Sequence, residues 1–234
     1  RLGIPYLWMI DGPHGVRAEI NWNDWGYAGG TNESCTAFPA LTCLAASWNP
    51  DLAAKYGKAI GEEARYREKD VLLGPGVNIY RTPLNGRNFE YLGEDPYLAS
   101  EMCVPYIQEV QKNGVAACVK HYALNNQELW RGHIDVQVSD RALYEIYLPA
   151  FKAAVQRGGV WSIMGAYNKV RGMHATHHKL LNNDILKSEW GFDGCVITDW
   201  GAAHDTYEAA MYGLDIEMGS YTNGLTSESG FWYD

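Results

Sequence analysis

The chain has few basic residues and no long apolar run. Its 234 residues include 19 lysines and arginines against 28 acidic residues, which gives a formal net charge of −9. Nucleic acids are polyanions and are repelled by a protein of this sign, so we expect no nucleic-acid partner. No apolar stretch reaches the roughly 18 residues that a membrane-spanning helix needs, so we expect no membrane partner either.

Cysteine is scarce. The five cysteines are odd in number, and none of them forms a CxxC pair of the kind that holds zinc. Cys118 and Cys195 lie in apolar segments, which predicts that both are small core residues. Cys35 and Cys43 lie in one loop and either pair or stay reduced. Cysteine usage therefore leaves the cellular compartment open.

A glycine-rich phosphate loop is also missing. The stretch GPGVNIYRTPLNGR has glycines, but it lacks the spacing and the helix start that cradle a pyrophosphate. This argues against a dinucleotide-binding fold. His174, His177 and His178 lie close together, yet no carboxylate stands at ligand spacing beside them, so we expect no metal site and no cofactor.

The chain does contain a regular alternation of apolar and amphipathic segments. The apolar segments predict strands at residues 6–10, 71–73, 115–119, 160–164, 195–198 and 214–218. Helices are predicted between most of them, at about 50–68, 97–112, 142–155 and 179–190. The helix ends carry recognisable signals, namely Asn49-Pro50, Asp95-Pro96, Ser139 and Gly191. Strands that alternate with helices in this way predict an α/β fold with a parallel sheet.

Chemically capable side chains gather where the predicted strands end. Asp11 follows the first strand, Lys120 and His121 follow the third, Tyr167 comes soon after the fourth, and Asp199 follows the fifth. Barrel enzymes build their sites at this carboxyl-terminal rim. We therefore predict a (β/α)8 barrel of the TIM type. It is incomplete at both ends of the chain, because about six strands are found where eight are needed.

Aromatic residues are abundant, with nine tryptophans and sixteen tyrosines. Flat aromatic faces suit the apolar faces of sugar rings, while charged side chains form directed hydrogen bonds to hydroxyl groups. Most of the aromatic residues are nevertheless expected to be core. The tryptophans expected in the core are Trp8, Trp161 and Trp190. Those in polar loops, where a packing role and a site or interface are equally open, are Trp22, Trp25 and Trp130.

Six long motifs follow one another along the chain. They are IDGPHGVR, AFPALTCLAASWNPDLA, LLGPGVNIYRTPLNGRNFEYLGEDP, VKHYALNNQE, MGAYNKVRG and WGFDGCVITDWGA. In these motifs the chain resembles glycoside hydrolase family 3, and in particular its β-glucosidase branch, essentially from end to end. Several long motifs in the right order are far more specific than any single one.

The resemblance implies roles for individual residues. The aspartate of the Thr-Asp-Trp motif, Asp199, would be the catalytic nucleophile. The substrate-binding residues would be Asp11, Arg87, Lys120, His121, Arg131, Tyr167 and Trp200. The implied activity is that of a retaining exo-β-glycosidase, which removes terminal β-D-glucosyl residues from a β-glucoside or oligosaccharide through a covalent glycosyl-aspartate. A β-xylosidase of the same family and a non-catalytic sugar-binding relative are the alternatives.

The branch within the family and the missing acid/base also follow from the resemblance. KHYALNNQ lacks the second histidine of the Lys-His-Phe-Pro-Gly-His stretch that marks the N-acetylglucosaminidase branch. In the β-glucosidase branch the acid/base is a glutamate on a separate domain, and Glu90, Glu94, Glu128 and Glu217 do not match it. We therefore expect residues 1–234 to be one catalytic barrel domain whose partner is the C-terminal domain of the same parent chain. The isolated piece would be weakly active or inactive, and its oligomeric state is open.

Some of these residues have a structural alternative. Asp199 alone could cap the residues that follow it, and Arg87 could hold Glu90 or Glu94 and organise its own loop. A nucleophile must stay ionised, so we expect neighbouring groups to keep the pKa of Asp199 low. The groups expected to do this are Lys120, His121, Arg131 and the Tyr167 hydroxyl.

Overall fold

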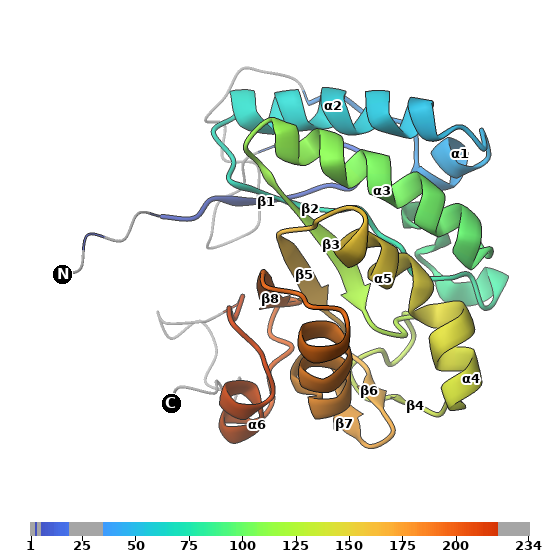
Figure 1. The fold of residues 1–234 in the computed structure, drawn as a ribbon, viewed down its shortest axis with the longest axis vertical. Coiled ribbons are helices and arrows are strands. Elements are labelled where there is room, and N and C mark those ends of the chain that lie inside the picture. Colours follow the sequence, from blue (N-terminus) through green and yellow to red (C-terminus); the bar gives the residue numbers. More distant parts are fainter. Residues whose placement is uncertain (1–2, 4–5, 19–34, 220–234) are drawn as a thin grey trace.

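Five parallel strands form the centre of the molecule. The computed structural model describes residues 3, 6–18 and 35–219. Within these residues the strands are β1 (Met9–Asp11), β2 (Val71–Leu73), β3 (Ala116–Tyr122), β5 (Ser162–Gly165) and β8 (Cys195–Thr198). They pair in the order β1-β2-β3-β5-β8, all in parallel (Figure 1). Spatial order that follows chain order is the arrangement of a barrel wall, whereas a doubly wound sheet reverses direction.

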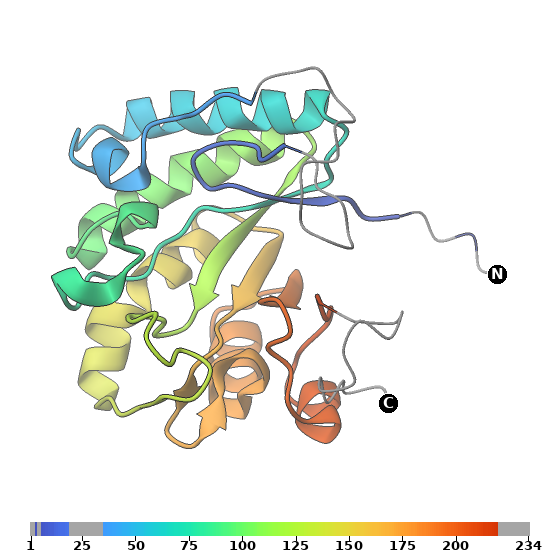
Figure 2. The same cartoon turned by 180° about the vertical axis from the view of Figure 1, so that it is seen from behind.

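Helices cover one face of this sheet. Figures 1 and 2 show α2, α3 and α5 packed side by side on the same side of the strands. The helical segments are α1 (Leu41–Ala45), α2 (Pro50–Tyr66), α3 (Pro96–Lys112), α4 (Asp140–Ala142), a π-helical turn (Leu143–Tyr147), α5 (Pro149–Gln156), a π-helix (Lys179–Glu189) and α6 (Thr206–Met211). None of the helices in the described residues is both long and apolar enough to cross a membrane.

The predicted helix starts are confirmed by their capping bonds. The Asn49 side chain accepts a hydrogen bond from the Leu52 amide at 3.2 Å, and the Asp95 side chain accepts one from the Tyr97 amide at 2.7 Å. In both cases a proline occupies the first helical turn, where its missing N–H has no helical partner to lose. Gly191 lies just after the last π-helix with φ of +73°, as a left-handed residue at a helix end does.

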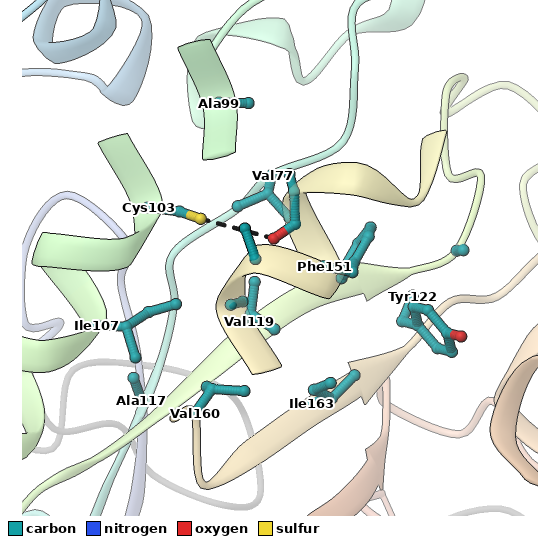
Figure 3. Packing of buried hydrophobic residues seen from close by; sticks show 14 of the residues in the cluster. Val77, Ala99, Cys103, Ile107, Ala117, Val119, Tyr122, Phe151, Val160 and Ile163 are labelled. Atoms are coloured by element: carbon teal, nitrogen blue, oxygen red, sulfur yellow. Dashed lines mark hydrogen bonds between the residues drawn. The ribbon is translucent and has the colours of Figure 1, made fainter. Parts of the chain in front are cut away.

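The two faces of the strands bury different sets of side chains. The side chains of Leu72, Val119 and Val196 point outward into the main core with the helices, where Val119 lies close to Phe151 of α5 (Figure 3). The alternate positions form a second, smaller cluster, namely Val71, Leu73, Cys118, Met164 and Ile197. Side chains alternate across a strand, so this second cluster marks the inner face of one curved sheet. The sheet is therefore part of a barrel, as predicted, and it is incomplete.

A second, three-stranded sheet lies among the loops that follow the barrel strands. It consists of β4 (Asp135–Val136), β6 (Lys169–Val170) and β7 (Met173–His174). Strand β4 comes from the loop after β3 and pairs in parallel with β6, which comes from the loop after β5. The small sheet therefore ties together two long loops that follow barrel strands.

Three strand predictions are wrong in extent, including the one at 115–119, where β3 runs from Ala116 to Tyr122. Strand β1 starts at Met9, and Tyr6 before it is 86% exposed. Residues 214–218 form no strand, although Ile216 makes a single bridge to Ile197 of β8. The reason lies in Asp215, whose side chain accepts the Val196 N–H at 2.8 Å and so replaces a backbone partner.

The structure also corrects the predicted burial of some residues. Trp190 is buried as expected, whereas Trp8 and Trp161 are about half exposed, at 48% and 49%. Cys195 is exposed as well, while Cys118 is buried. The three exposed residues lie just before or at the amino-terminal ends of β1, β5 and β8, where the packed layers stop. Cys35 and Cys43 are both free thiols, Trp130 is 67% exposed, and Trp22 and Trp25 lie outside the described residues.

Candidate active site

The predicted site residues on the strands meet at one rim. Asp11 is the last residue of β1, and Asp199 follows β8 directly. Strand β3 runs on to Tyr122, so Lys120 and His121 belong to the strand itself instead of following it. The peptide bond between these two residues is cis. The carboxyl-terminal ends of parallel strands lie at the same edge, which brings these side chains together.

Asp199 is held by its own neighbourhood in the chain. Its backbone N–H donates to the Gly165 carbonyl at the end of β5, at 3.2 Å. Its Oδ1 accepts the Trp200 N–H at 2.7 Å, and its Oδ2 lies 3.6 Å from Nε2 of His121. The side chain is 15% exposed. One carboxylate oxygen is thus fixed by the backbone, while the other faces the groups of the rim.

The expectation of a lowered pKa at Asp199 is wrong in direction. Burial raises the pKa of this carboxyl above its ordinary value of 3.8, and this effect outweighs the Trp200 N–H and the positive charges of Lys120, Arg87 and Arg131, which all lower it. Of the groups expected to lower it, Lys120 and Arg131 do so, His121 and the Tyr167 hydroxyl are not among the causes, and Arg87 acts although it was not expected to. The sequence did not show how far the carboxylate is removed from water, and desolvation disfavours its charged form.

His121 is neutral and cannot serve as one of those cations. Burial, followed by the charges of Arg87, Lys120 and Arg131, lowers its pKa well below 6.5. Nη2 of Arg87 lies 3.1 Å from Nε2 of His121, and a guanidinium can only donate. Nε2 is therefore the acceptor, and Nδ1 carries the proton and donates to the Tyr91 hydroxyl at 3.0 Å.

Asn78 fixes the backbone on which this imidazole stands. Its Oδ1 accepts the His121 N–H at 2.8 Å, and its Nδ2 donates to the His121 carbonyl at 2.9 Å. Both residues are almost fully buried. Asn78 and Tyr91 were not among the predicted site residues, and neither has a sequence signal beyond its place in the long motif around GPGVNIY.

Glu90 lies behind two of the predicted cations. Arg87 donates to it through Nε at 2.7 Å and Nη2 at 2.9 Å, and Nζ of Lys120 lies 3.0 Å from its Oε1. Burial raises the pKa of Glu90, but Lys120 and Arg87 together lower it to about 2. Of the two partners considered for Arg87, Glu90 and Glu94, the structure selects Glu90.

Glu128 connects Arg87 to the other predicted arginine. Its Oε2 accepts from Nη1 of Arg131 at 2.7 Å, and its Oε1 lies 3.6 Å from Nη1 of Arg87. The Arg131 guanidinium lies over the ring of Tyr167, 4.3 Å from its centroid. The three-residue spacing from Glu128 to Arg131 was a signal for this ion pair, although Glu128 was considered only as an acid/base.

Tyr167 joins the arginines to the loop that carries Asp199. Its hydroxyl donates to the Trp200 carbonyl at 2.8 Å. Burial and the charge of Asp199 raise the pKa of Tyr167, so the phenol stays protonated. Trp200, which is partly buried, is thus held through its backbone on both sides, by Asp199 and by Tyr167.

Asp11 forms the open side of the rim. Its side chain is 45% exposed and lies 3.8 Å from Nζ of Lys120 and 3.4 Å from Nη1 of Arg17. Together the rim offers one sheltered carboxylate, three positive side chains, a neutral imidazole and a phenol. Such a set can hold a ring with several hydroxyl groups and attack an electrophilic carbon.

Three histidines cluster beside the loop after β8. The ring of His174 stacks on that of His204 at 3.9 Å between centroids, and His177 Nδ1 lies 2.8 Å from a Glu208 carboxylate oxygen. His174 Nδ1 also donates to the Tyr167 carbonyl at 3.2 Å. Among the residues that the structure describes, no three His, Cys, Asp or Glu side chains are grouped so as to hold a metal ion.

Acid is expected to destabilise the protein through this cluster. Burial and His204 lower the pKa of His174 from 6.5 to about 4, and burial also lowers that of His204. Between pH 6.5 and about 4 the unfolded chain binds protons at these histidines that the folded chain does not. The contribution of the neutral histidines to the free energy of unfolding is therefore fully present above about pH 6.5 and is lost as the pH falls toward 4. The thermal unfolding midpoint should decrease between pH 7 and pH 5, and less so in a His204→Asn variant. Equal decreases in both proteins would contradict this.

Comparison with known proteins agrees with this geometry. A family model described as the glycosyl hydrolase family 3 N terminal domain matches residues 1–218. The chain is 92% identical over 234 residues to beta-glucosidase BoGH3A of Bacteroides ovatus. The aligned region is 100% of this chain and 31% of that protein. It is 45% identical over 222 residues to an exo-alpha-(1->6)-L-arabinopyranosidase of Bifidobacterium longum, where the aligned region is 94% of this chain and 29% of that protein.

Solved structures show the same likeness. Beta-glucosidase 3B from Thermotoga neapolitana, in complex with glucose, superposes with a TM-score of 0.87 at 42% identity, with 94% of this chain and 30% of that chain covered. The chain thus spans about a third of the length of the relatives that it matches. On the family match over residues 1–218 and the incomplete barrel, the chain belongs to glycoside hydrolase family 3, as its N-terminal domain.

Proposed function

We propose that the full-length protein is a retaining exo-β-glycosidase that removes terminal β-D-glucosyl residues through a covalent intermediate on Asp199. The observation that carries this proposal is the position of the Asp199 carboxylate. It is sheltered but not closed off, at a rim shared with Lys120, Arg87 and His121. The names of relatives such as beta-glucosidase BoGH3A support the glucoside.

Asp199 would act through its Oδ2 atom. Its Oδ1 accepts a hydrogen bond from the Trp200 N–H, which leaves Oδ2 to attack the anomeric carbon. The bond from that carbon to the leaving oxygen breaks, and a protonated carboxyl gives its proton to that oxygen. Water then attacks the glycosyl-aspartate with the same carboxyl as base, which releases the sugar and restores Asp199.

The other rim residues would bind the sugar. Arg87 and Lys120 would donate to its hydroxyl groups, and Asp11, on the open side, would accept from them. His121 contributes as a neutral imidazole with a fixed tautomer. Arg131, Tyr167 and Trp200 would form the wall beside the nucleophile.

The second carboxyl of the pair would come from outside this chain. Glu90 and Glu128 are both paired with arginines, and Lys120 and Arg87 lower the pKa of Glu90 to about 2, which is unsuitable for an acid that must be protonated. We therefore propose that residues 1–234 form the catalytic barrel domain and that the C-terminal domain of the parent chain supplies the acid/base. The share of 31% in BoGH3A leaves room for that domain. The isolated piece is then weakly active at best.

A fluorosugar experiment tests the nucleophile. A 2-deoxy-2-fluoro-β-glucoside with a good leaving group traps the glycosyl-enzyme of a retaining enzyme, and peptide mass mapping locates the label. In the full-length protein we expect the label on the peptide that contains Asp199. No label, or a label on another carboxylate, would remove the proposal and favour a non-catalytic sugar-binding relative.

A pentoside is the second candidate substrate. Two relatives named exo-alpha-(1->6)-L-arabinopyranosidase are 45% and 44% identical to this chain. The thermostable beta-glucosidase B of Acetivibrio thermocellus is 45% identical, so identity does not separate the two activities. Arabinopyranosides and xylosides both lack the 6-hydroxymethyl group of glucose. Nitrophenyl β-glucoside, β-xyloside and α-L-arabinopyranoside, compared by kcat/KM, would distinguish the three activities.

A further inference from the structure

Glu90 is the buried acid on which two rim cations converge. It ends a short 3-10 turn, Asn88–Glu90, and only 8% of its side chain is exposed. Both of its oxygens are engaged, Oε2 by Nε of Arg87 at 2.7 Å and Oε1 by Nη2 of Arg87 at 2.9 Å and by Nζ of Lys120 at 3.0 Å. A two-point guanidinium contact fixes direction as well as distance.

Lys120 depends on this contact. Its side chain is 4% exposed, and among the described residues its other acidic neighbour within 4 Å is Asp11, at 3.8 Å. A buried ammonium without a paired carboxylate is unfavourable, so without Glu90 it would move toward Asp11 or toward Asp199. Arg87 would lose both of its short bonds, and with them the orientation in which it donates to His121.

The charge of Glu90 also acts on the nucleophile. Lys120, Arg87 and Arg131 lower the pKa of Asp199. Glu90 pairs with two of these cations, Arg87 and Lys120, so its negative charge opposes their effect on Asp199. The remaining titratable groups around these cations are Glu128, beside both arginines, Asp11, beside Lys120, and His14, whose pKa is lowered by burial, raised by Glu90 and lowered by Lys120. His121 is neutral, and Tyr91 and Tyr167 stay protonated, so they do not replace the charge of Glu90.

We infer that Glu90 is a positioning residue for the proposed glycosidase reaction: it touches no substrate, but it sets where Lys120 and Arg87 stand and how strongly their charges act on Asp199. This role rests on the proposed function, because it is exerted on the sugar-binding cations and on the nucleophile. Neither the family match nor the relatives' names assign it.

The Glu90→Gln variant of the full-length protein tests the role. The amide keeps the size of the side chain and removes its charge. We expect kcat/KM for nitrophenyl β-glucoside to fall about 10- to 100-fold, because the cations shift by a fraction of an ångström or more. The acidic limb of the pH profile of kcat/KM, which reports Asp199 in the free enzyme, should move to lower pH, because the cations are no longer offset.

Two further variants separate charge from structure. Glu90→Asp keeps the charge and shortens the reach, so it should lose rate while its acidic limb stays as in the wild type. Glu94→Gln, an exposed acid four residues along, should change neither quantity. Folding of each variant is checked by circular dichroism. If Glu90→Gln does not fold, Glu90→Asp decides alone, and an unchanged rate in it overturns the inference.

The failures of the two proposals can be told apart. An active enzyme labelled at Asp199, in which Glu90→Gln retains kcat/KM within about threefold or keeps the wild-type acidic limb, overturns the role of Glu90 only. An equal shift of the acidic limb in Glu90→Asp and Glu90→Gln also overturns the role of Glu90 and leaves the proposed function standing. Absence of the label on Asp199 in the wild type overturns the proposed function itself.

Discussion

The Asp199→Asn variant of the full-length protein is expected to lose at least about 10³-fold in kcat on nitrophenyl β-glucoside. The amide has nearly the shape of the carboxylate and can still accept the Trp200 N–H that holds Oδ1 at 2.7 Å. It carries no negative charge, and its oxygen is a poor nucleophile toward the anomeric carbon. The loss should therefore appear in kcat, with the substrate still bound, and single-turnover kinetics would measure it.

A matched control and a chemical rescue make this result specific. Asp193 is an exposed aspartate shortly before β8, and Asp193→Asn should leave kcat unchanged. In Asp199→Gly the removed side chain leaves space for azide, which should restore turnover and release α-glucosyl azide, because attack from the face of the nucleophile inverts the anomeric centre. Activity of Asp199→Asn within tenfold of the wild type would contradict the assignment.

The barrel could be predicted from the sequence because its signals are local. A run such as Cys195-Val196-Ile197 is apolar at every residue, and caps such as Asn49 and Asp95 mark where helices begin. Where the prediction failed, a tertiary contact replaced the local signal. Residues 214–218 alternate apolar and acidic side chains as a strand can, yet the Asp215 side chain accepts the Val196 N–H that the backbone of a sixth strand would accept. No periodicity reveals such a contact.

The position of the candidate site could also be predicted, because the ends of parallel strands meet at one edge. Its electrostatics could not. The sequence shows that Lys120, Arg87 and Arg131 are cations, but burial decides that the pKa of Asp199 is raised and that His121 is neutral. Burial depends on the whole fold, and it is the largest cause of the pKa shift in both residues.

The acids that organise the rim were only partly visible in the sequence, for a related reason. Glu90 was named with Glu94 as a possible partner of Arg87, whereas Glu128 was considered only as an acid/base, since a glutamate in a loop has no pattern that distinguishes catalysis from support. The structure shows that both hold arginines. A site built from scattered loops depends on such supporting acids, and a single sequence reveals them only where the partner lies three residues away, as it does in both pairs.

Phe151 packs strand β3, which carries Lys120 and His121, against the helix layer. It lies in α5, is fully buried, and meets the ring of Tyr122 edge to face at 5.1 Å between centroids (Figure 3). Tyr122 in turn donates its hydroxyl to the Leu181 carbonyl at 2.8 Å. Tyr122, which packs on Phe151, follows His121 directly in β3. A change in the packing at Phe151 is therefore transmitted to the rim through the neighbouring residue.

The Phe151→Ala variant is therefore expected to destabilise this part of the barrel by about 3–5 kcal/mol, through lost burial and the cavity that remains. Hydrogen exchange of the β3 amides in the full-length protein measures the local opening free energy directly. Phe89→Ala, at a phenylalanine that is 52% exposed, is the matched control and should cost no more than about 1 kcal/mol. A change below about 1 kcal/mol at β3 in Phe151→Ala would mean that the core relaxes around the missing ring, and that α5 does not hold the strand in place.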